Sequence, residues 1–250
     1  MQNRYTGDIG DFGKFLLLKH LFPHDTITTI WYLYPDETHN TDGSHTVEEG
    51  NVRLYRNCHT LDPLMSELFN TIHQENLRHV ELFETYPVLR NGRYFKESIV
   101  GKGDEYRRGW LERALAFTEK NHSSVVCLDP DNGIEPASVA KLSYIKQSKY
   151  ATYTEIEHFF VLECVQHLVI YQHFHRQCSH VAQMKEAKAR FETLYQGRAV
   201  VTIIRHNPVQ ARFYILLSKP EYSLNTLSSL EELRYATKAF FSVLRGVNEY

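Results

Sequence analysis

The sequence lacks any long uninterrupted run of hydrophobic residues. A helix that spans a bilayer needs about 20 consecutive apolar residues, and the apolar runs of this chain are much shorter. The chain begins with a polar segment that contains acidic side chains, MQNRYTGDIGDFGK, and this segment has no apolar core of the kind found in signal peptides. We therefore expect a cytoplasmic protein with no membrane-spanning segment.

Paired cysteines are also missing. The chain has four cysteines that lie far apart and form no Cys-x-x-Cys pair: Cys58, Cys127, Cys164 and Cys178. This spacing argues against a zinc ribbon. Two of the cysteines lie in apolar segments and are expected to be buried thiols, which fits a reducing compartment.

A strong excess of charge of one sign is absent as well. The formal net charge is -2 over 250 residues, so the chain has no overall basic field of the kind that marks many nucleic-acid-binding proteins. A local basic groove remains compatible with this total. The length suits one α/β domain with a substantial core.

Segments with the patterns of strands and helices alternate along the chain. Strands are predicted from β-branched, aromatic and apolar runs at 26–34, 79–84, 125–129, 167–174, 199–205 and 211–218. Helices are predicted from apolar periodicity and capping residues at 12–22, 62–74, 103–120, 137–147, 153–163, 181–195 and 229–247. Residues 87–104 show no clear period and are interpreted as a loop or small insertion.

This alternation predicts a single Rossmann-like α/β domain over residues 1–250, with a mainly parallel sheet and helices on both faces. The last two predicted strands lie close in sequence and should form an antiparallel pair. Ligands of such sheets bind outside the carboxyl ends of the strands. Two polar turns follow predicted strands, PDETHNTDG after the first and DPDNG after a middle one. We expect both turns to face one crevice.

Three segments of the chain resemble the bacterial large-subunit (23S) ribosomal RNA adenine-N6 methyltransferases. The first runs from Gly7 through Asp11 to Lys14 and leads into a Leu-rich helix, as does the Gly-Asn-x-x-Asp-x-x-Lys stretch of that family. The second, Glu37–Gly43, follows the first strand as the family's cofactor loop does. The third, Asp129–Asn132, stands in the place of the family's Asp-Pro-Pro-Tyr turn.

This resemblance implies a class I methyltransferase fold, S-adenosylmethionine as cofactor, and nucleic acid as partner. It implies a target amine held by Asp129 and Pro130, and groups oriented from the N-terminal side by Lys14 and Asp11. The implied catalytic residues are Asp129, Pro130, Asp131 and Lys14, and the implied cofactor-binding residues are Asp11, Glu37, His39, Asn40 and Gly43. Asp131 and Asn132 replace the second proline and the aromatic residue, so a tyrosine from elsewhere would have to stack on the base.

The abundance of acids near the expected crevice supports a different hypothesis. Clustered carboxylates repel one another unless a cation compensates them, and Mg²⁺ or Mn²⁺ bound to carboxylate oxygens can activate water against a phosphate. The metal ligands in this alternative are Asp36, Asp42, Asp129 and Asp131. The protein would then be a metal-dependent nuclease or phosphohydrolase on a methyltransferase-like fold.

A third hypothesis is non-catalytic. A fold of this type that has lost the glycines of its cofactor loop can serve as a nucleotide- or partner-binding subunit. The Arg-rich stretch 90–108 would suit docking to RNA, DNA or protein.

Overall fold

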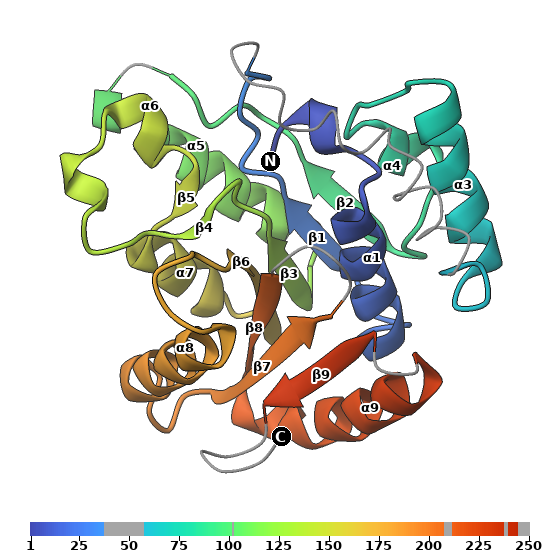
Figure 1. The fold of residues 1–250 in the computed structure, drawn as a ribbon. Helices are drawn as coiled ribbons and strands as arrows, with labels where there is room; N and C mark the ends of the chain where they lie inside the picture. Colours follow the sequence, from blue (N-terminus) through green and yellow to red (C-terminus); the bar gives the residue numbers. More distant parts are fainter. Residues whose placement is uncertain (38–57, 102, 208–211, 238–239, 245–250) are drawn as a thin grey trace.

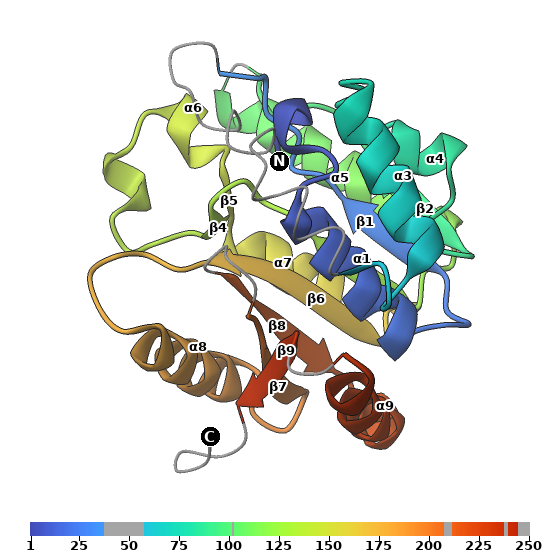
Figure 2. The same cartoon turned by 45° about the vertical axis from the view of Figure 1, so that its right-hand side comes forward.

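The computed structural model describes residues 1–37, 58–101, 103–207, 212–237 and 240–244. It has three layers, with a central β-sheet between two layers of helices (Figures 1 and 2). The expected Rossmann-like α/β fold is thereby confirmed.

Seven strands of the described chain form the central sheet in the order β2-β1-β3-β6-β8-β7-β9. They are β1 (Ile27–Ile30), β2 (Gly92–Phe95), β3 (Val125–Leu128), β6 (His167–His173), β7 (Val200–His206), β8 (Arg212–Ser218) and β9 (Phe241–Leu244). The strands β2, β1, β3 and β6 are parallel, whereas β8 runs antiparallel between β6 and β7. The short strands β4 (Gly133–Ile134) and β5 (Tyr150–Ala151) pair separately.

Helices cover both faces of this sheet. One face packs against α1 (Ile9–Leu21), α3 (Pro63–Gln74), α4 (Leu82–Thr85) and α9 (Ser223–Ala236), and the other against α5 (Gly103–Lys120), α7 (Tyr153–Phe160) and α8 (His180–Leu194). Shorter helical turns are η1 (Asn3–Tyr5), η3 (Val139–Lys141), α6 (Tyr144–Gln147) and η4 (Pro220–Tyr222). No described helix combines the length and the apolar character that crossing a membrane requires.

Local sequence signals explain the elements that were predicted correctly. The side chain of Asp62 caps α3 by accepting a hydrogen bond from the Met65 main-chain N–H, and Pro63 occupies the first turn. Thr152 and Glu155 form a capping box at the start of α7. The four residues of β3 are all buried, as expected for a central parallel strand. The predicted antiparallel pair is β7 and β8.

The strand predicted at 79–84 is wrong, because this segment leads into the helix α4. Val80 and Phe83 are both buried, and their spacing of three residues suits a helical turn rather than a strand. The missing parallel strand is β2, which lies inside 87–104, the segment interpreted as a loop or small insertion. It is an edge strand flanked by arginine, lysine and glycine, and such residues hide the pattern of a strand.

The helix predicted at 229–247 is also partly wrong. The helix α9 ends at Ala236, and Phe241–Leu244 form β9, which pairs antiparallel with β7. The sequence of β9, FSVL, contains aromatic and β-branched residues that favour a strand over a helix. The pairing of β7 with β9 is therefore the third antiparallel pairing in the sheet, after β6 with β8 and β8 with β7.

Candidate functional site

The N-terminal end of α1 places two carboxylates and one ammonium group near the carboxyl ends of the central strands. Asp8 is the N-cap, and its side chain accepts a hydrogen bond from the main-chain N–H of Asp11 at 2.8 Å. Asp11 in turn accepts from the main-chain N–H of Gly7 at 2.9 Å. The helix begins three residues earlier than the sequence predicted, because Asp8 rather than a later residue caps it.

Lys14 is the centre of the site. Its side chain is only 2% exposed, and its Nζ lies 2.7 Å from Asp11 Oδ1 and 3.1 Å from Asp129 Oδ2. Nζ also lies 4.1 Å from the centroid of the Trp31 ring, which adds a cation–π interaction. A buried ammonium group is tolerated only where such partners replace its hydration. Lys14 therefore links α1 to the residue that follows β3.

Asp129 extends the hydrogen-bond ladder between β1 and β3 by one residue. Its main-chain N–H donates to the Ile30 carbonyl at the end of β1, so the carboxylate is held where β1 and β3 lie side by side. From β1 the chain continues to β2 on one side, and from β3 it continues to β6 on the other side. Open α/β sheets bind ligands where the strand order reverses in this way.

Burial and charge shift the pKa values of this cluster in opposite directions. Burial raises the pKa of Asp11, and although Lys14 lowers it, the result is a pKa of about 6 with Asp8 and Asp129 nearby. Burial opposes the charge of Lys14, but Asp11 and Asp129 together raise its pKa above the ordinary value. Lys14 therefore stays protonated while Asp11 titrates near neutral pH.

A second buried ion pair lies beside the first. Arg212, the first residue of β8, approaches Asp8 at 3.4 Å and has its guanidinium group over the Tyr171 ring. The absence of a side chain at Gly10 makes room for it, because a Cβ there would lie 1.4 Å from Arg212 Nη1. The Tyr171 hydroxyl is 2.9 Å from His173 Nδ1, and burial raises the pKa of Tyr171 to about 12.

The acidic turn after β3 carries a third group of charges. Asp131 lies 3.3 Å from Lys149 Nζ and 3.8 Å from the Met1 ammonium nitrogen, and it accepts a hydrogen bond from Gln2 Nε2 at 2.9 Å. Lys149 also pairs with Glu37 at 2.7 Å. Burial alone would raise the pKa of Asp131, but these partners hold it below its ordinary value. Asp131 is therefore an ionised carboxylate.

The first two residues of the chain are buried against the segment that follows β1. The Met1 nitrogen donates to the Tyr32 carbonyl at 2.9 Å, and the Tyr34 N–H donates to the Met1 carbonyl at 2.8 Å. The Glu37 N–H donates to Gln2 Oε1 at 3.1 Å. Met1 is 7% exposed and Gln2 is 1% exposed. These residues join the segment that follows β1 to the turn that follows β3.

The shape of the turn is fixed by its neighbours. Gly133 has a φ of +95°, and a Cβ there would lie 2.6 Å from Gln172 Oε1. That same oxygen accepts the main-chain N–H of Ile134 at 2.8 Å, and the Asn132 N–H donates to the Lys149 carbonyl at 2.9 Å. The glycine is thus required both for its backbone conformation and for the close approach of β6.

The structure brings together many of the residues that the sequence indicated. Asp11, Lys14 and Asp129 form one cluster, and Asp131 and Glu37 are joined through Lys149. Pro130 is buried between the two groups. Four predicted residues lie outside the described residues: His39, Asn40, Asp42 and Gly43.

Lysine side chains compensate two of the four carboxylates that were expected to bind a metal ion. Asp129 pairs with Lys14 and Asp131 with Lys149, while Asp36 accepts the main-chain N–H of Arg4 at 3.1 Å. Across the part of the chain that the structure describes, no three His, Cys, Asp or Glu side chains are placed to hold a metal. The premise that these acids are uncompensated is therefore wrong for Asp129 and Asp131.

Sequence reasoning missed three kinds of participant. Lys149, Tyr171 and Arg212 belong to segments in which the sequence shows no site motif. Each pairs with a residue far away in the chain, which no local pattern reveals. Met1 and Gln2 stand in the polar N-terminal segment, ahead of the residues that carry the resemblance.

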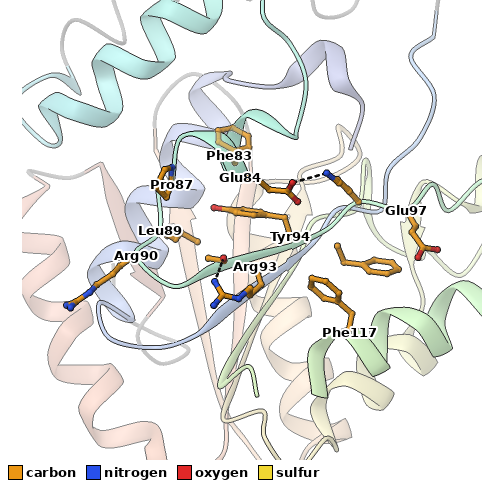
Figure 3. A pocket seen from close by; sticks show the side chains of 12 residues that line it. Phe83, Glu84, Pro87, Leu89, Arg90, Arg93, Tyr94, Glu97 and Phe117 are labelled. Carbon is orange, nitrogen blue, oxygen red and sulfur yellow. Dashed lines mark hydrogen bonds and ion pairs between the residues drawn. The ribbon is translucent and has the colours of Figure 1, made fainter. Parts of the chain in front are cut away.

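A separate surface pocket of about 500 Å³ lies along the edge strand β2 (Figure 3). Its lining combines aromatic side chains, such as Tyr94 and Phe117, with Arg90 and Arg93. Both arginines are exposed, and Figure 3 shows Arg90 pointing away from the aromatic rings. The pocket therefore has an apolar floor, and its lining carries charges of both signs, because Glu84 and Glu97 also belong to it.

Comparison with models of known protein families, with curated proteins and with solved structures found no match.

Substitution of Lys14 by methionine should destabilise the protein strongly. Without the ammonium group, Asp11 and Asp129 would face each other without a cation, so the free energy of unfolding should fall by about 3–5 kcal/mol. Lys19→Met is the matched control on the same helix, because Lys19 pairs with Asp62 at a half-exposed position and should cost at most about 1 kcal/mol. Urea unfolding followed by circular dichroism measures both; equal losses would contradict the central role of Lys14.

The raised pKa of Asp11 predicts a specific pH dependence. The folded state holds the proton more tightly than the unfolded chain, whose pKa is 3.8, so the stability that Asp11 contributes is complete below 3.8 and is lost as the pH rises through about 6. Asp11→Asn cannot titrate. The free energy of unfolding of the variant minus that of wild type should therefore rise by roughly 1–3 kcal/mol between pH 4 and pH 7. Urea unfolding at several pH values measures this difference, and a constant difference would refute the prediction.

Proposed function

We propose that the protein is an S-adenosylmethionine-dependent methyltransferase of class I type that modifies an amino group of a nucleic-acid base, of the adenine-N6 kind. One observation carries this proposal. Asp129, placed by the resemblance at the target amine, stands at the junction of β1 and β3 and is held by Lys14. The same resemblance selected Lys14 and Asp11 from a segment more than 100 residues away.

The order of the strands supports the proposal. An antiparallel strand, β8, lies between two strands of the opposite direction at the C-terminal side of the sheet. A terminal antiparallel strand pair that follows alternating strands and helices with a parallel sheet is typical of class I methyltransferases. The fold by itself does not define a reaction, so the residues at the crevice have to carry the argument.

The chain's own residues have distinct roles in this proposal. Asp129 accepts a hydrogen bond from the target amine and stabilises the positive charge that develops on its nitrogen. Lys14 holds Asp129 Oδ2 and so fixes the direction in which Oδ1 points. The carbonyl of Pro130 is the second acceptor that the resemblance implies. Lys14 itself does not need to touch the substrate and is a positioning residue.

The residues at the crevice fit S-adenosylmethionine in charge. The described residues beside the turn after β3 include the carboxylates of Glu37 and Asp131 and the ammonium group of Lys149, which pair with one another. They carry the two signs of charge that would complement an amino-acid moiety. When bound, the cofactor would supply an electrophilic methyl group. Glu37 and Asp131 would lie on its ammonium side and Lys149 on its carboxylate side.

Two tyrosines near the turn, Tyr34 and Tyr171, each have a cation close to the ring. Lys149 Nζ lies 4.6 Å from the Tyr34 ring centroid, and the Arg212 guanidinium lies 5.3 Å from that of Tyr171. Base recognition would therefore depend on Asn132, whose side-chain amide can both donate and accept hydrogen bonds, more than on stacking.

The proposal predicts that the protein binds S-adenosylmethionine without added metal and that Asp129→Asn abolishes methyl transfer. Neutral asparagine cannot stabilise the charge on the amine, so the rate should fall on the order of 100-fold or more, while cofactor affinity changes little. Calorimetric titration measures binding, and transfer of a radioactive methyl group to RNA and DNA oligonucleotides measures the reaction.

Asp25→Asn is the control for this experiment. Asp25 accepts a hydrogen bond from Ser124 at the opposite, amino-terminal end of β3, so the variant should retain full activity. An active Asp129→Asn enzyme would contradict the assignment. Heat with Mg²⁺ or Mn²⁺ and none with the cofactor would instead support metal-dependent phosphoryl transfer, and nuclease assays would follow.

The exposed arginines beside β2 provide a test of the proposed partner. The double variant Arg90→Ala/Arg93→Ala should weaken binding to a 20-nucleotide RNA or DNA and reduce the slope of log affinity against log salt by up to about 1–2. Arg113→Ala is the control, because this arginine pairs with Glu97 and its charge is already compensated. Fluorescence anisotropy at several salt concentrations measures both, and an unchanged slope for the double variant would place the nucleic acid elsewhere.

A further inference from the structure

A tyrosine and a histidine at the end of β6 form a hydrogen-bonded pair beside Asp129. Leu128 of β3 is paired with Ile170 of β6. The residues that follow them, Asp129 and Tyr171, are therefore neighbours across the two strands. Both side chains lie on the face of the sheet that α1 covers. The Tyr171 hydroxyl lies 2.9 Å from Nδ1 of His173, the last residue of β6, so it points toward the carboxyl end of the sheet.

We propose that the hydroxyl of Tyr171 accepts the proton that the target amine loses, and that His173 carries this proton to solvent. The inference deepens the proposed function and rests on it, because it assigns a route to a proton that methylation of an amine must release. Neither residue belongs to the segments that carry the resemblance.

A proton acceptor other than Asp129 is needed because Asp129 is engaged by Lys14. Its Oδ2 lies 3.1 Å from the buried Lys14 Nζ. A proton on Asp129 would remove one of the two carboxylate charges that replace the hydration of this ammonium group, which is costly in a buried position. Asp129 therefore orients the amine, and the proton passes to a neighbouring group.

The Tyr171 hydroxyl is suited to receive it. A phenolic hydroxyl donates one hydrogen bond and can accept others. Within the described chain, His173 Nδ1 is its one hydrogen-bond partner, so the oxygen remains able to accept from an amine. Burial raises the pKa of Tyr171 to about 12, although Arg212 lowers it. The Arg212 guanidinium lies 5.3 Å from the ring centroid and favours the negative charge that develops on the oxygen while the proton passes.

His173 connects the pair to solvent. The residue is exposed, although its ring lies against that of Tyr171, with 6.3 Å between the centroids. The loss of hydration on this side lowers the pKa of His173, and so does Arg212 from β8. The carboxylates of Asp131, after β3, and Asp8, at the start of α1, oppose this effect. The imidazole is therefore neutral at pH 7 and able to accept a proton.

Atoms and charges balance in this step. The amine nitrogen forms a bond to the methyl group, and the bond between that methyl group and sulfur breaks with its electrons going to sulfur. The electrons of the amine N–H bond return to nitrogen as the proton moves to Tyr171 Oη, and the original Tyr171 proton moves to His173 Nδ1. The positive charge of the sulfonium group thereby passes to an imidazolium, which releases a proton from Nε2 to water.

The first experiment tests the pair without a substrate. Spectra of protein labelled with ¹⁵N in histidine distinguish the two ring nitrogens, and the His173 signals are identified by their loss in His173→Gln. Nδ1 should be a hydrogen-bond acceptor and Nε2 protonated. Tyr171→Phe keeps the ring and should shift the Nδ1 signal toward that of an unbonded nitrogen. Tyr153→Phe is the control, because its hydroxyl accepts from Arg190 on the opposite face of the sheet.

The second experiment measures transfer of a radioactive methyl group to RNA and DNA oligonucleotides as a function of pH. Because His173 must be neutral, the wild-type rate should rise as the pH increases through the pKa of His173, which lies below its ordinary value of 6.5, and then level off. Tyr171→Phe and His173→Gln should lose this rise and lower kcat about 100-fold, with KM nearly unchanged. Tyr153→Phe and His158→Gln are the controls, since His158 is exposed and contacts the Thr154 carbonyl.

The outcomes distinguish the inference from the proposed function. An active wild type whose kcat survives both substitutions would overturn the proton route and leave the proposed function standing, as would an unmoved Nδ1 signal in Tyr171→Phe. A rise with pH that persists in His173→Gln would belong to another group, such as Asp11, and would also overturn the role of His173. If wild type methylates none of the oligonucleotides, the proposed function is overturned and the proton route with it. His173 is exposed, so His173→Gln keeps the test valid even where Tyr171→Phe does not fold.

Discussion

The ammonium group of Lys14 is the constraint on which the arrangement of the crevice depends. It is buried between Asp11 on its own helix and Asp129 after β3, and a lysine in that position is stable only while both carboxylates remain close. The pair fixes the start of α1 against the end of β3. Because β3 pairs with β1, it also fixes the segments that follow these two strands.

Charge neutrality explains how so many acids gather at one edge of the sheet. Arg212 pairs with Asp8, and Lys149 pairs with Asp131. Lys14 pairs with both Asp11 and Asp129. Each cation comes from a different part of the chain, so folding itself assembles the compensation. An apolar sheet thus carries a polar layer at its carboxyl edge, where the protein's own cations occupy the role that a metal ion would have in a site of uncompensated carboxylates.

Local patterns in the sequence were sufficient for the fold class and for half of the site. The apolar run before Asp129 marked a central strand, and the spacing of Asp11 and Lys14 marked the start of a helix. The edge strand β2 escaped because charged residues interrupt its short pattern. Lys149 and Arg212 escaped for another reason: their partners are set by tertiary structure, and a lone lysine or arginine carries no signal of the carboxylate that it will meet.

Asp131 shows that the role of an acidic side chain depends on the partners that the fold brings to it. In the sequence its carboxylate could serve a metal, a base or a cofactor. In the structure Lys149 and Gln2 hold it from two other segments of the chain, and its partners keep it ionised although it is buried. The turn that contains Asp131 could not reveal this, because tertiary structure brings these partners together.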